Sequence, residues 1–465
     1  MNRSTIKTIV IFVSIVIVIS VTASNAFSQG GRKSRRVQQL EQQAGRAYLQ
    51  KDFRLAIERY AEAIVLLPTN PDAHFWKGNA HHFLQQNDLA LSELDEAFKQ
   101  GHSPLDIYKV RWSVGFARKN YDAALSDVID GLKLEPTNNL FLIGAGDIYL
   151  AKGALPEALA SYQRALVADP NNADLHYQVA EVHSRTGDAD AQLASAKMAI
   201  SKNTRFLGEA LFLLGDAHQK RREMDDAIDA YTKALQSKPD IYLAYRKLAT
   251  LYAGQSRFDE AIDISNQARK QFPGDGYIYT DISWYYSLAN RHEDAVQAAL
   301  AGVRYLPPEL QYLAYTNLCR AYNDTAKYQS AVSACNTSLR LNSSDGEAQY
   351  YLGRAFELLG KPEEASKYYN KAVPLLMSHA AKNSESSDAY YLLGNGYYSD
   401  NQMEKAAQAY TRCLELSPRF VKAIFNLGVT RVAQRNKAAA MEQYNNLLPL
   451  DRALAQKLKA EIDKL

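Results

Sequence analysis

Three histidines near the start of the chain are the first side chains with metal-binding chemistry. His74 and His81 fall on one face of a predicted helix, and His82 follows directly. Seven helical residues rise about 10 Å, which is too far for both rings to bind one ion. The same spacing puts His74 and His81 on the face that packs into the core. We therefore expect these histidines to be packing residues, and the sequence predicts no metal site.

Three cysteines could form disulfides or act as nucleophiles. Cys319, Cys335 and Cys413 are too few and too irregularly spaced for a disulfide framework or a zinc site. Each occupies a core-facing position of a predicted helix, where cysteine packs as a small hydrophobic residue. Cys319 and Cys335 lie on two consecutive predicted helices, so an oxidising compartment could join them. The sequence leaves that disulfide open.

Catalytic signatures are missing from the sequence. It contains no GxSxG, HExxH, CxxC or P-loop lysine motif. The glycine pairs in LIGAGDIYL and LLGNGYY lie inside predicted helices, without the strand or the third glycine of a phosphate-binding loop. We therefore predict that the chain is not an enzyme and binds no cofactor.

The elements that carry these residues follow a strict repeat. The stretch ALPEALASYQRALVADPNN belongs to a unit of 34 residues that starts at Asn139. Counted from that start, small residues occupy frame positions 8, 20 and 27, aromatic residues occupy positions 11 and 24, and proline occupies position 32. The same frame fits twelve windows, which begin at residues 37, 71, 105, 139, 173, 208, 242, 276, 312, 346, 387 and 421.

The small positions of this frame recur too regularly to reflect composition. Position 20 is alanine in eleven of the twelve windows and fails only at Gln192. Position 8 is small in eleven windows and fails only at Trp112, whose bulk puts a close helix contact there in doubt. Two short helices joined by a tight turn cannot bury their apolar faces alone, so neighbouring pairs must stack.

This pattern resembles the tetratricopeptide repeat (TPR) family over residues 37–454. The resemblance implies an all-α fold, a right-handed superhelical solenoid of about twelve helix pairs with a C-terminal capping helix. Ten residues fall between frames, seven of them in AAKNSES at 380–386. In the final segment, Leu450, Leu454, Leu458 and Ile462 form one apolar stripe, as in a capping helix with a polar outer face.

The N-terminal residues resemble a targeting segment. Residues 1–36 carry six basic residues and no acidic ones, so the net charge of +3 leaves −3 for the remainder. Such a nearly neutral body gives no support for nucleic-acid binding. Positive charge, the apolar run TIVIFVSIVIVISV and small residues in TASNAFS are typical of a signal peptide that is cleaved after Ala26 or Ser28.

The domain organisation follows from these features. We predict a signal peptide at 1–26, a basic linker at 27–36, a repeat array at 37–448 and a capping helix at 449–465. An uncleaved membrane anchor at 8–27 is the alternative, and the protein would touch a membrane only in that case. The basic stretch RKSRR would then favour a cytoplasmic body.

Partner binding is expected on the concave face of the array. In proteins of similar pattern, frame positions 2, 5, 9, 12 and 13 line that face. The predicted groove residues, all from positions 5 and 9, are Asp147, Glu181, Asp216, Arg246, Trp284, Arg320, Tyr350, Arg354, Tyr391 and Asn395. The family's carboxylate clamp needs Lys at position 5 and Asn at position 9, a combination that this chain lacks.

Charges in this groove are segregated along the array. Position 9 is acidic at Asp147, Glu181 and Asp216 and basic at Arg320 and Arg354. Like charges stacked one repeat apart repel, which favours a partner of complementary charge. We therefore expect Arg320 and Arg354 to bind an acidic or carboxylate-bearing stretch of a protein or peptide.

The sequence thus predicts an exported, periplasmic or extracellular scaffold that binds an extended partner segment, for example in assembly of the cell envelope. One alternative is a membrane-tethered cytoplasmic adaptor. Another is a subunit that positions substrates for a separate enzyme such as a transferase.

Overall fold

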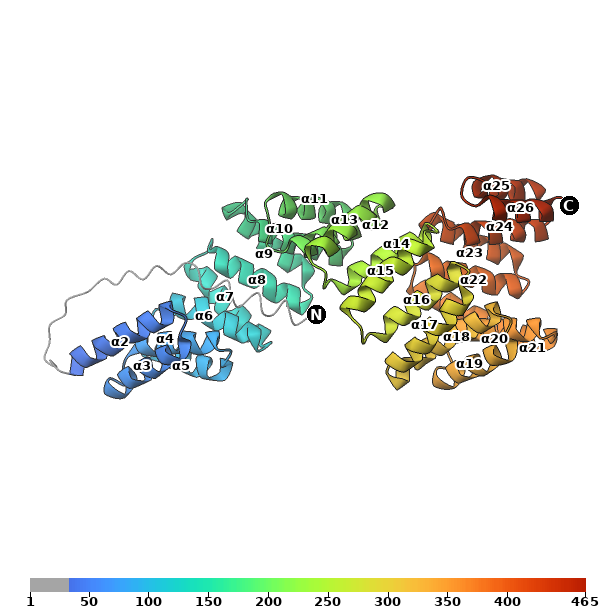
Figure 1. Cartoon of the computed structure of the whole chain (residues 1–465). Coiled ribbons are helices and arrows are strands. Elements are labelled where there is room, and N and C mark those ends of the chain that lie inside the picture. The colour runs from blue at the N-terminus through green and yellow to red at the C-terminus, as the bar shows by residue number, and fades with distance from the viewer. Residues whose placement is uncertain (1–32) are drawn as a thin grey trace. The chain divides into compact units, whose positions relative to one another are not determined.

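The computed structural model describes residues 33–465, and every regular element in that range is a helix (Figure 1). No strand occurs within these residues, which confirms the predicted all-α class. The helices fall into two compact units, unit 1 ending at Leu213 and unit 2 running from Leu214 to Leu465. Helix α12 (Leu207–Lys220) contains the boundary.

In unit 1, consecutive helices pack as antiparallel pairs. The helices before α12 are α2 (Lys33–Leu49), α3 (Phe53–Leu66), α4 (Pro71–Phe83), α5 (Asn87–Lys99), α6 (Pro104–Ala117), α7 (Tyr121–Leu134), α8 (Asn139–Lys152), α9 (Leu155–Ala168), α10 (Ala173–Thr186) and α11 (Ala189–Ser201).

Unit 2 continues the same order. Its helices after α12 are α13 (Met224–Ser237), α14 (Tyr242–Gly254), α15 (Phe258–Gln271), α16 (Gly276–Leu288), α17 (His292–Tyr305), the 3₁₀ helix η2 (Pro308–Leu310), α18 (Gln311–Asp324), α19 (Tyr328–Leu341), α20 (Gly346–Leu358), α21 (Pro362–Lys382), α22 (Ser387–Ser399), α23 (Met403–Leu416), α24 (Val421–Ala433), α25 (Lys437–Leu447) and α26 (Arg452–Ile462).

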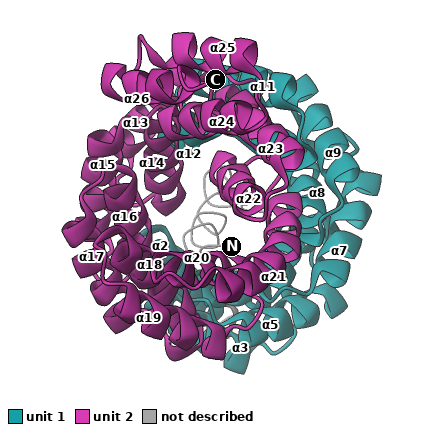
Figure 2. Cartoon of the chain, turned by 90° about the vertical axis from the view of Figure 1, so that its right-hand side faces the viewer, with its two compact units in different colours: residues 1–213 teal, residues 214–465 magenta. Residues whose placement is uncertain are grey.

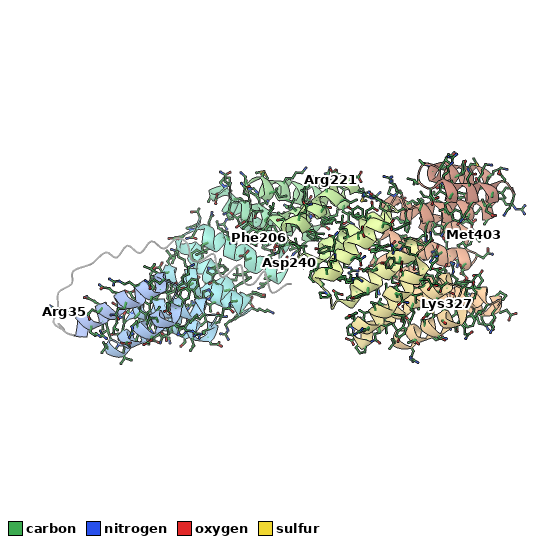
Figure 3. All side chains as sticks on the ribbon, in the orientation of Figure 1. Arg35, Phe206, Arg221, Asp240, Lys327 and Met403 are labelled. Carbon is green, nitrogen blue, oxygen red and sulfur yellow. A yellow bond between two sulfur atoms is a disulfide. The ribbon has the colours of Figure 1, made fainter. Side chains whose placement is uncertain are left out.

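The turn inside each helix pair has the same backbone conformation. Frame position 15 has a positive φ in all twelve windows, at Lys51, Gln85, Lys119, Gly153, Gly187, Arg222, Ser256, Asn290, Ala326, Gly360, Asn401 and Arg435. Arg221, beside one of these residues, marks such a turn in Figure 3. A single left-handed residue reverses the chain sharply enough to lay the second helix against the first. The twelve-window frame is therefore visible in the backbone.

The small frame positions are buried between the helices, as predicted. The alanines at position 20, such as Ala158 and Ala295, are at most 2% exposed. At the exception, Gln192 is buried and its Nε2 donates to the carbonyl oxygen of Leu213 at 2.7 Å. Trp112, the exception at position 8, is accommodated because it packs on Gly144, where a β-carbon would lie 3.1 Å from the indole ring.

In four repeats, glycine at position 8 packs against tyrosine at position 24 of the same repeat. A β-carbon on Gly394 would lie 2.5 Å from Tyr410 Cε1, and one on Gly146 would lie 2.3 Å from Tyr162 Cε1. These helices can approach only because the glycine has no side chain. The tyrosine ring then fills the space that glycine leaves.

The insertion AAKNSES changes the path of unit 2. Its first residues prolong α21, which has 21 residues and ends at Lys382, whereas α19 and α23 have 14 each. The next helix, α22, lies on the inner side of the curve formed by the other helices of unit 2 (Figure 2). Consistent with this position, a β-carbon on Gly254 at the end of α14 would lie 4.0 Å from Ser387 Oγ at the start of α22.

Polar contacts fix this inward fold of unit 2. Ser256 Oγ, in the turn between α14 and α15, donates to the Arg419 carbonyl oxygen at 3.1 Å and accepts from the Val421 amide at 3.0 Å. Lys422 Nζ donates to the Ser287 carbonyl oxygen and to Asn290 Oδ1, both at 3.2 Å. The start of α24 is therefore in direct contact with the turns that follow α14 and α16.

At the C-terminus, α26 packs on the array with Leu458 and Ile462 fully buried. None of the helices described in residues 33–465 combines the length and apolar character needed to cross a membrane. The predicted signal peptide, the alternative anchor and most of the basic linker lie outside the described residues.

Candidate functional site

Most of the charged side chains at frame position 9 have partners within the chain. In unit 1, Asp147 accepts a hydrogen bond from the Tyr162 hydroxyl at 2.6 Å, and Glu181 pairs with Arg185 one helical turn away. Burial raises the pKa of Asp147 to about 7, although the bond from Tyr162 opposes that rise. Asp147 is therefore a buried structural carboxyl rather than a free surface charge.

In unit 2 the same holds for Asp216 and Arg246. Asp216 lies 2.8 Å from Lys220 Nζ and 3.4 Å from Lys247 Nζ. Arg246 Nε donates to Asp281 Oδ2 at 2.9 Å. Because these side chains have partners within the chain, their charges do not require an external ligand.

Arg320 is the most enclosed of the predicted groove residues, with 3% of its surface exposed. Its Nη1 donates to Glu347 Oε1 at 2.9 Å, its Nη2 to Asn317 Oδ1 at 2.6 Å and its Nε to Ser287 Oγ at 3.3 Å. The guanidinium also lies over the Trp284 ring, 4.3 Å from the centroid, where the π-face attracts a cation. Every guanidinium nitrogen of Arg320 therefore has a partner within the chain.

The remaining predicted groove residues lie largely in the core. Tyr350 and Tyr391 are buried, with ring contacts to Tyr369 at 5.8 Å and to Phe420 at 5.0 Å respectively. Asn395 Oδ1 accepts from the Tyr410 hydroxyl at 2.7 Å. Each of these contacts joins residues of one repeat window, so the aromatic side chains contribute to packing within a repeat.

Arg354 is half-exposed, and its Nη2 lies 3.9 Å from Asp324 Oδ1. The separation is long for a charge-assisted hydrogen bond, so this pair leaves the guanidinium more available than that of Arg320. Arg354 does not line the cavity described next.

A cavity of about 350 Å³ opens on the inner side of unit 2. We call it the inner pocket. Its wall combines α16, α18, α20, the last turns of α21 and the first turns of α22. Of the predicted groove residues, Trp284 and Arg320 line it. The pocket exists because the long α21 brings α22 opposite helices from earlier repeats.

Carboxyl groups dominate the inner pocket. Asp281, Asp345, Glu347 and Asp388 line it together with a single guanidinium, that of Arg320. Burial raises the pKa of Glu347 to about 7 and that of Asp388 to about 6, although Arg320 lowers both and the Trp284 indole lowers that of Asp388. The pocket therefore carries acid groups that titrate close to neutral pH.

These four acids are not among the groove residues predicted from the sequence. Glu347 and Asp388 both occupy frame position 2, one of the positions expected on the concave face. The predicted groove residues, however, come from positions 5 and 9. Acidic residues at position 2 of two consecutive windows were the available signal. Asp281, at position 6, could be found only through its contact with Arg246.

The histidines singled out from the sequence are buried, as predicted. His74 Nδ1 lies 2.6 Å from Glu93 Oε2, His81 Nδ1 lies 2.6 Å from Gln86 Oε1, and His82 Nε2 lies 3.1 Å from Ser113 Oγ. Elsewhere, His218, Glu223 and Asp226 bring ligand-type atoms together, but Arg221 already pairs with Glu223 at 2.9 Å. We interpret that group as an ion-pair network.

The cysteines answer the question that the sequence left open. Cys319 and Cys335 form a disulfide between α18 and α19, with their Cα atoms 5.2 Å apart. The pair is therefore oxidised, and the disulfide occupies the core-facing positions at which the cysteines were expected to pack. Cys413 is free and buried.

Comparison with known proteins extends the sequence resemblance. Family models described as tetratricopeptide repeat match residues 43–104, 212–276, 317–384 and 387–420, and a model described as TPR repeat matches 146–187. A TPR repeat-containing protein of Methanocaldococcus jannaschii is 22% identical over 323 residues, which are 64% of this chain and 55% of that protein.

A second relative is a probable UDP-N-acetylglucosamine–peptide N-acetylglucosaminyltransferase, SPINDLY, of Hordeum vulgare. It is 27% identical over 150 residues, which are 32% of this chain and 13% of that protein. The chain thus spans little more than half of one relative and a small part of the other.

Two solved structures align with the fold. A tetratricopeptide repeat protein from Parabacteroides merdae aligns with a TM-score of 0.44 and 16% identity, over 56% of this chain and 98% of that one. The APC/C hetero-tetramer Cut9–Hcn1 aligns with a TM-score of 0.33 and 14% identity, over 92% and 96%. On the sequence matches, the chain belongs to the tetratricopeptide repeat family, whose stacked helix pairs act as scaffolds for protein–protein interaction.

Proposed function

We propose that this protein is an exported, non-catalytic scaffold that holds an extended segment of a protein partner against the inner face of unit 2. The observation that carries the proposal is the inner pocket, which is lined by helices from four different repeats. A site built from several repeats can recognise a segment only when the array is assembled. The predicted role is assembly of the cell envelope.

Export is supported by two independent features. The first is the signal-peptide pattern of the N-terminal residues. The second is the disulfide between Cys319 and Cys335, because disulfides persist mainly in oxidising compartments. A membrane-tethered cytoplasmic adaptor is the alternative, and RKSRR after the apolar run favours it.

A second candidate function is positioning substrates for a separate enzyme. The match to a plant protein named as a probable N-acetylglucosaminyltransferase motivates it. Because that match covers 13% of the transferase, it supports a shared repeat region rather than shared catalysis. Co-purification with a transferase would favour this candidate.

Site-specific photo-crosslinking tests the scaffold proposal. A photoreactive amino acid at Leu313, which lines the inner pocket, should capture a partner when the full-length protein is irradiated in its own cells. The matched control is the same amino acid at Leu300, an exposed residue of α17. Capture from Leu313 but not from Leu300 is the expected result. Equal capture from both, or none from Leu313, would contradict binding at the inner face.

A further inference from the structure

The inner pocket has the size and lining of a site for one side chain. Its volume of about 350 Å³ is near the lower end of ligand pockets, which span about 300–1,000 Å³. Trp284, Leu376 and Leu392 supply apolar surface, and the carboxyl groups supply charge. A long side chain with an apolar stem and a charged end fits such a lining.

The charges of the pocket favour a cation. Its lining has four carboxyl groups against one guanidinium. Two of these acids already have ionic partners, Glu347 in Arg320 and Asp281 in Arg246. Asp345 is held by the hydroxyl groups of Thr316 and Ser338 and by the Ala348 amide. Among residues 33–465, Asp388 has no ion-pair partner within 4.0 Å, so it is the acid left to meet an incoming charge.

An anionic partner would meet the wrong surroundings. Arg320, the cation expected from sequence to bind a carboxylate, donates from all three nitrogens to groups of the chain. A carboxylate beside Arg320 would share it with Glu347 and would also face Asp388 and Asp345. Repulsion between these carboxylates and an incoming carboxylate disfavours its binding.

We propose that the inner pocket takes a lysine or arginine side chain from the partner segment, with Asp388 as its principal counter-ion and Trp284 beside its stem. This inference rests on the proposed scaffold function and names the chemistry that the scaffold recognises. Arg320 is then a positioning residue, since it fixes Glu347 and lies over the Trp284 ring.

Several other titratable groups surround this site. The groups that face it or lie against its wall are Arg246 from α14, Asp281 from α16, Tyr312 and Arg320 from α18, Asp345 and Glu347 at the start of α20, His379 from α21, Asp388 from α22 and Lys422 from α24. A bound cation favours ionised carboxyl groups. Its affinity should therefore rise as the pH increases through the pKa values of Asp388, about 6, and Glu347, about 7.

Defined peptides test the inference on the full chain. The probes are capped, fluorescent heptapeptides of alanine, serine and tyrosine with a central Arg, Lys, Gln or Glu, and fluorescence anisotropy reports binding. We expect the Arg and Lys peptides to bind about tenfold more tightly than the Gln peptide, and the Glu peptide to bind most weakly.

Two variants locate the effect. Asp388→Asn should weaken the Arg peptide about tenfold and flatten much of its pH dependence, whereas Glu363→Gln, the same charge change at an exposed site of α21, should leave both unchanged. Burial already favours the neutral form of Asp388, so the protein should tolerate an amide at this position. Circular dichroism checks that the variant folds. Tightest binding of the Glu peptide, equal binding of all four peptides, or binding of none would overturn the inference. If any of these results is obtained but Leu313 still crosslinks to a partner, the cation-binding inference is wrong and the proposed scaffold function is retained.

Discussion

Cys319 and Cys335 form their disulfide at the two frame positions where Gly353 and Tyr369 pack in the next repeat. A covalent bond thus joins α18 and α19 at the positions where, in four other repeats, a tyrosine ring packs against a glycine. This bond closes a loop with a sequence separation of 16 residues. Constraining a loop of that length lowers the entropy of the unfolded chain.

Removing the disulfide should destabilise unit 2. Cys319→Ala with Cys335→Ala should lower the free energy of unfolding by about 3 kcal/mol, measured by urea denaturation under oxidising conditions. The pair Cys319→Gly with Cys335→Tyr restores the packing of the other repeats, so it should be better tolerated than Cys335→Tyr alone. A thiol assay on the unreduced, denatured protein should find Cys413 as the single free thiol. Three free thiols would contradict the disulfide.

The glycines that pack against a tyrosine of the same repeat should not tolerate a β-carbon. Gly394→Ala would place that carbon 2.5 Å from the Tyr410 ring and should cost about 1–3 kcal/mol of stability through overpacking. Gly274→Ala is the matched control, because no atom would lie within 4 Å of the new methyl group. Thermal unfolding of both variants checks the prediction, and equal losses would refute the packing assignment.

The left-handed turns offer a test of the repeat frame. Ala326, exposed with φ at 57°, should gain stability on replacement by glycine, by about 0.5–1 kcal/mol. Gly360, with φ at 75° and open space around it, should lose about 1 kcal/mol as Gly360→Ala. Opposite signs in chemical denaturation are expected. The same sign for both would mean that the turns differ between these repeats.

Stability should depend on pH through Asp147. Its pKa in the folded protein, about 7, is above the value of about 3.9 in an unfolded chain, so the folded state binds more protons between these pH values. Stability therefore falls as the pH rises from about 4 to 7. Asp147→Asn keeps an acceptor for Tyr162 and should be more stable than the wild type at pH 8 by about 1–3 kcal/mol. At pH 4 the two proteins should be similar, and a variant less stable at pH 8 would show that the carboxylate is favourable.

The mature chain is predicted to begin near Phe27 or Gln29. N-terminal sequencing of the protein isolated from its own cells checks this directly. Intact Met1 would instead favour the membrane anchor, and protection from protease added outside the inner membrane would then favour the cytoplasmic adaptor.

The sequence predicted the helix pairs because their positions depend on local rules. Proline two residues after helices such as α9 and α13, and alanine at frame position 20, each have a direct physical reason. The turn at position 15 was not predicted, since lysine, serine and alanine occupy it as well as glycine. Tertiary contacts impose that conformation on residues that do not prefer it.

The candidate site was predictable only in part. Trp284 and Arg320 were assigned to the inner face from their frame positions, and both line the pocket. The acids that surround them were not predicted, because AAKNSES falls between the repeat frames. In the structure its first residues prolong α21, and α22 lies on the inner side of unit 2. Asp388 lines the pocket because α22 lies on the inner side of unit 2, and the repeat frame alone does not predict that position. For this reason the proposed ligand is cationic, whereas the sequence predicted an acidic one.

The most direct test is to map what is captured from Leu313. The full-length protein carrying a photoreactive amino acid at that position is irradiated in its own cells, and mass spectrometry identifies the crosslinked partner residues. We predict a segment with a lysine or arginine within a few residues of the crosslink, and strongly reduced capture when Asp388→Asn is added. A captured segment rich in aspartate and glutamate, with capture unaffected by Asp388→Asn, would contradict a cation-binding inner pocket.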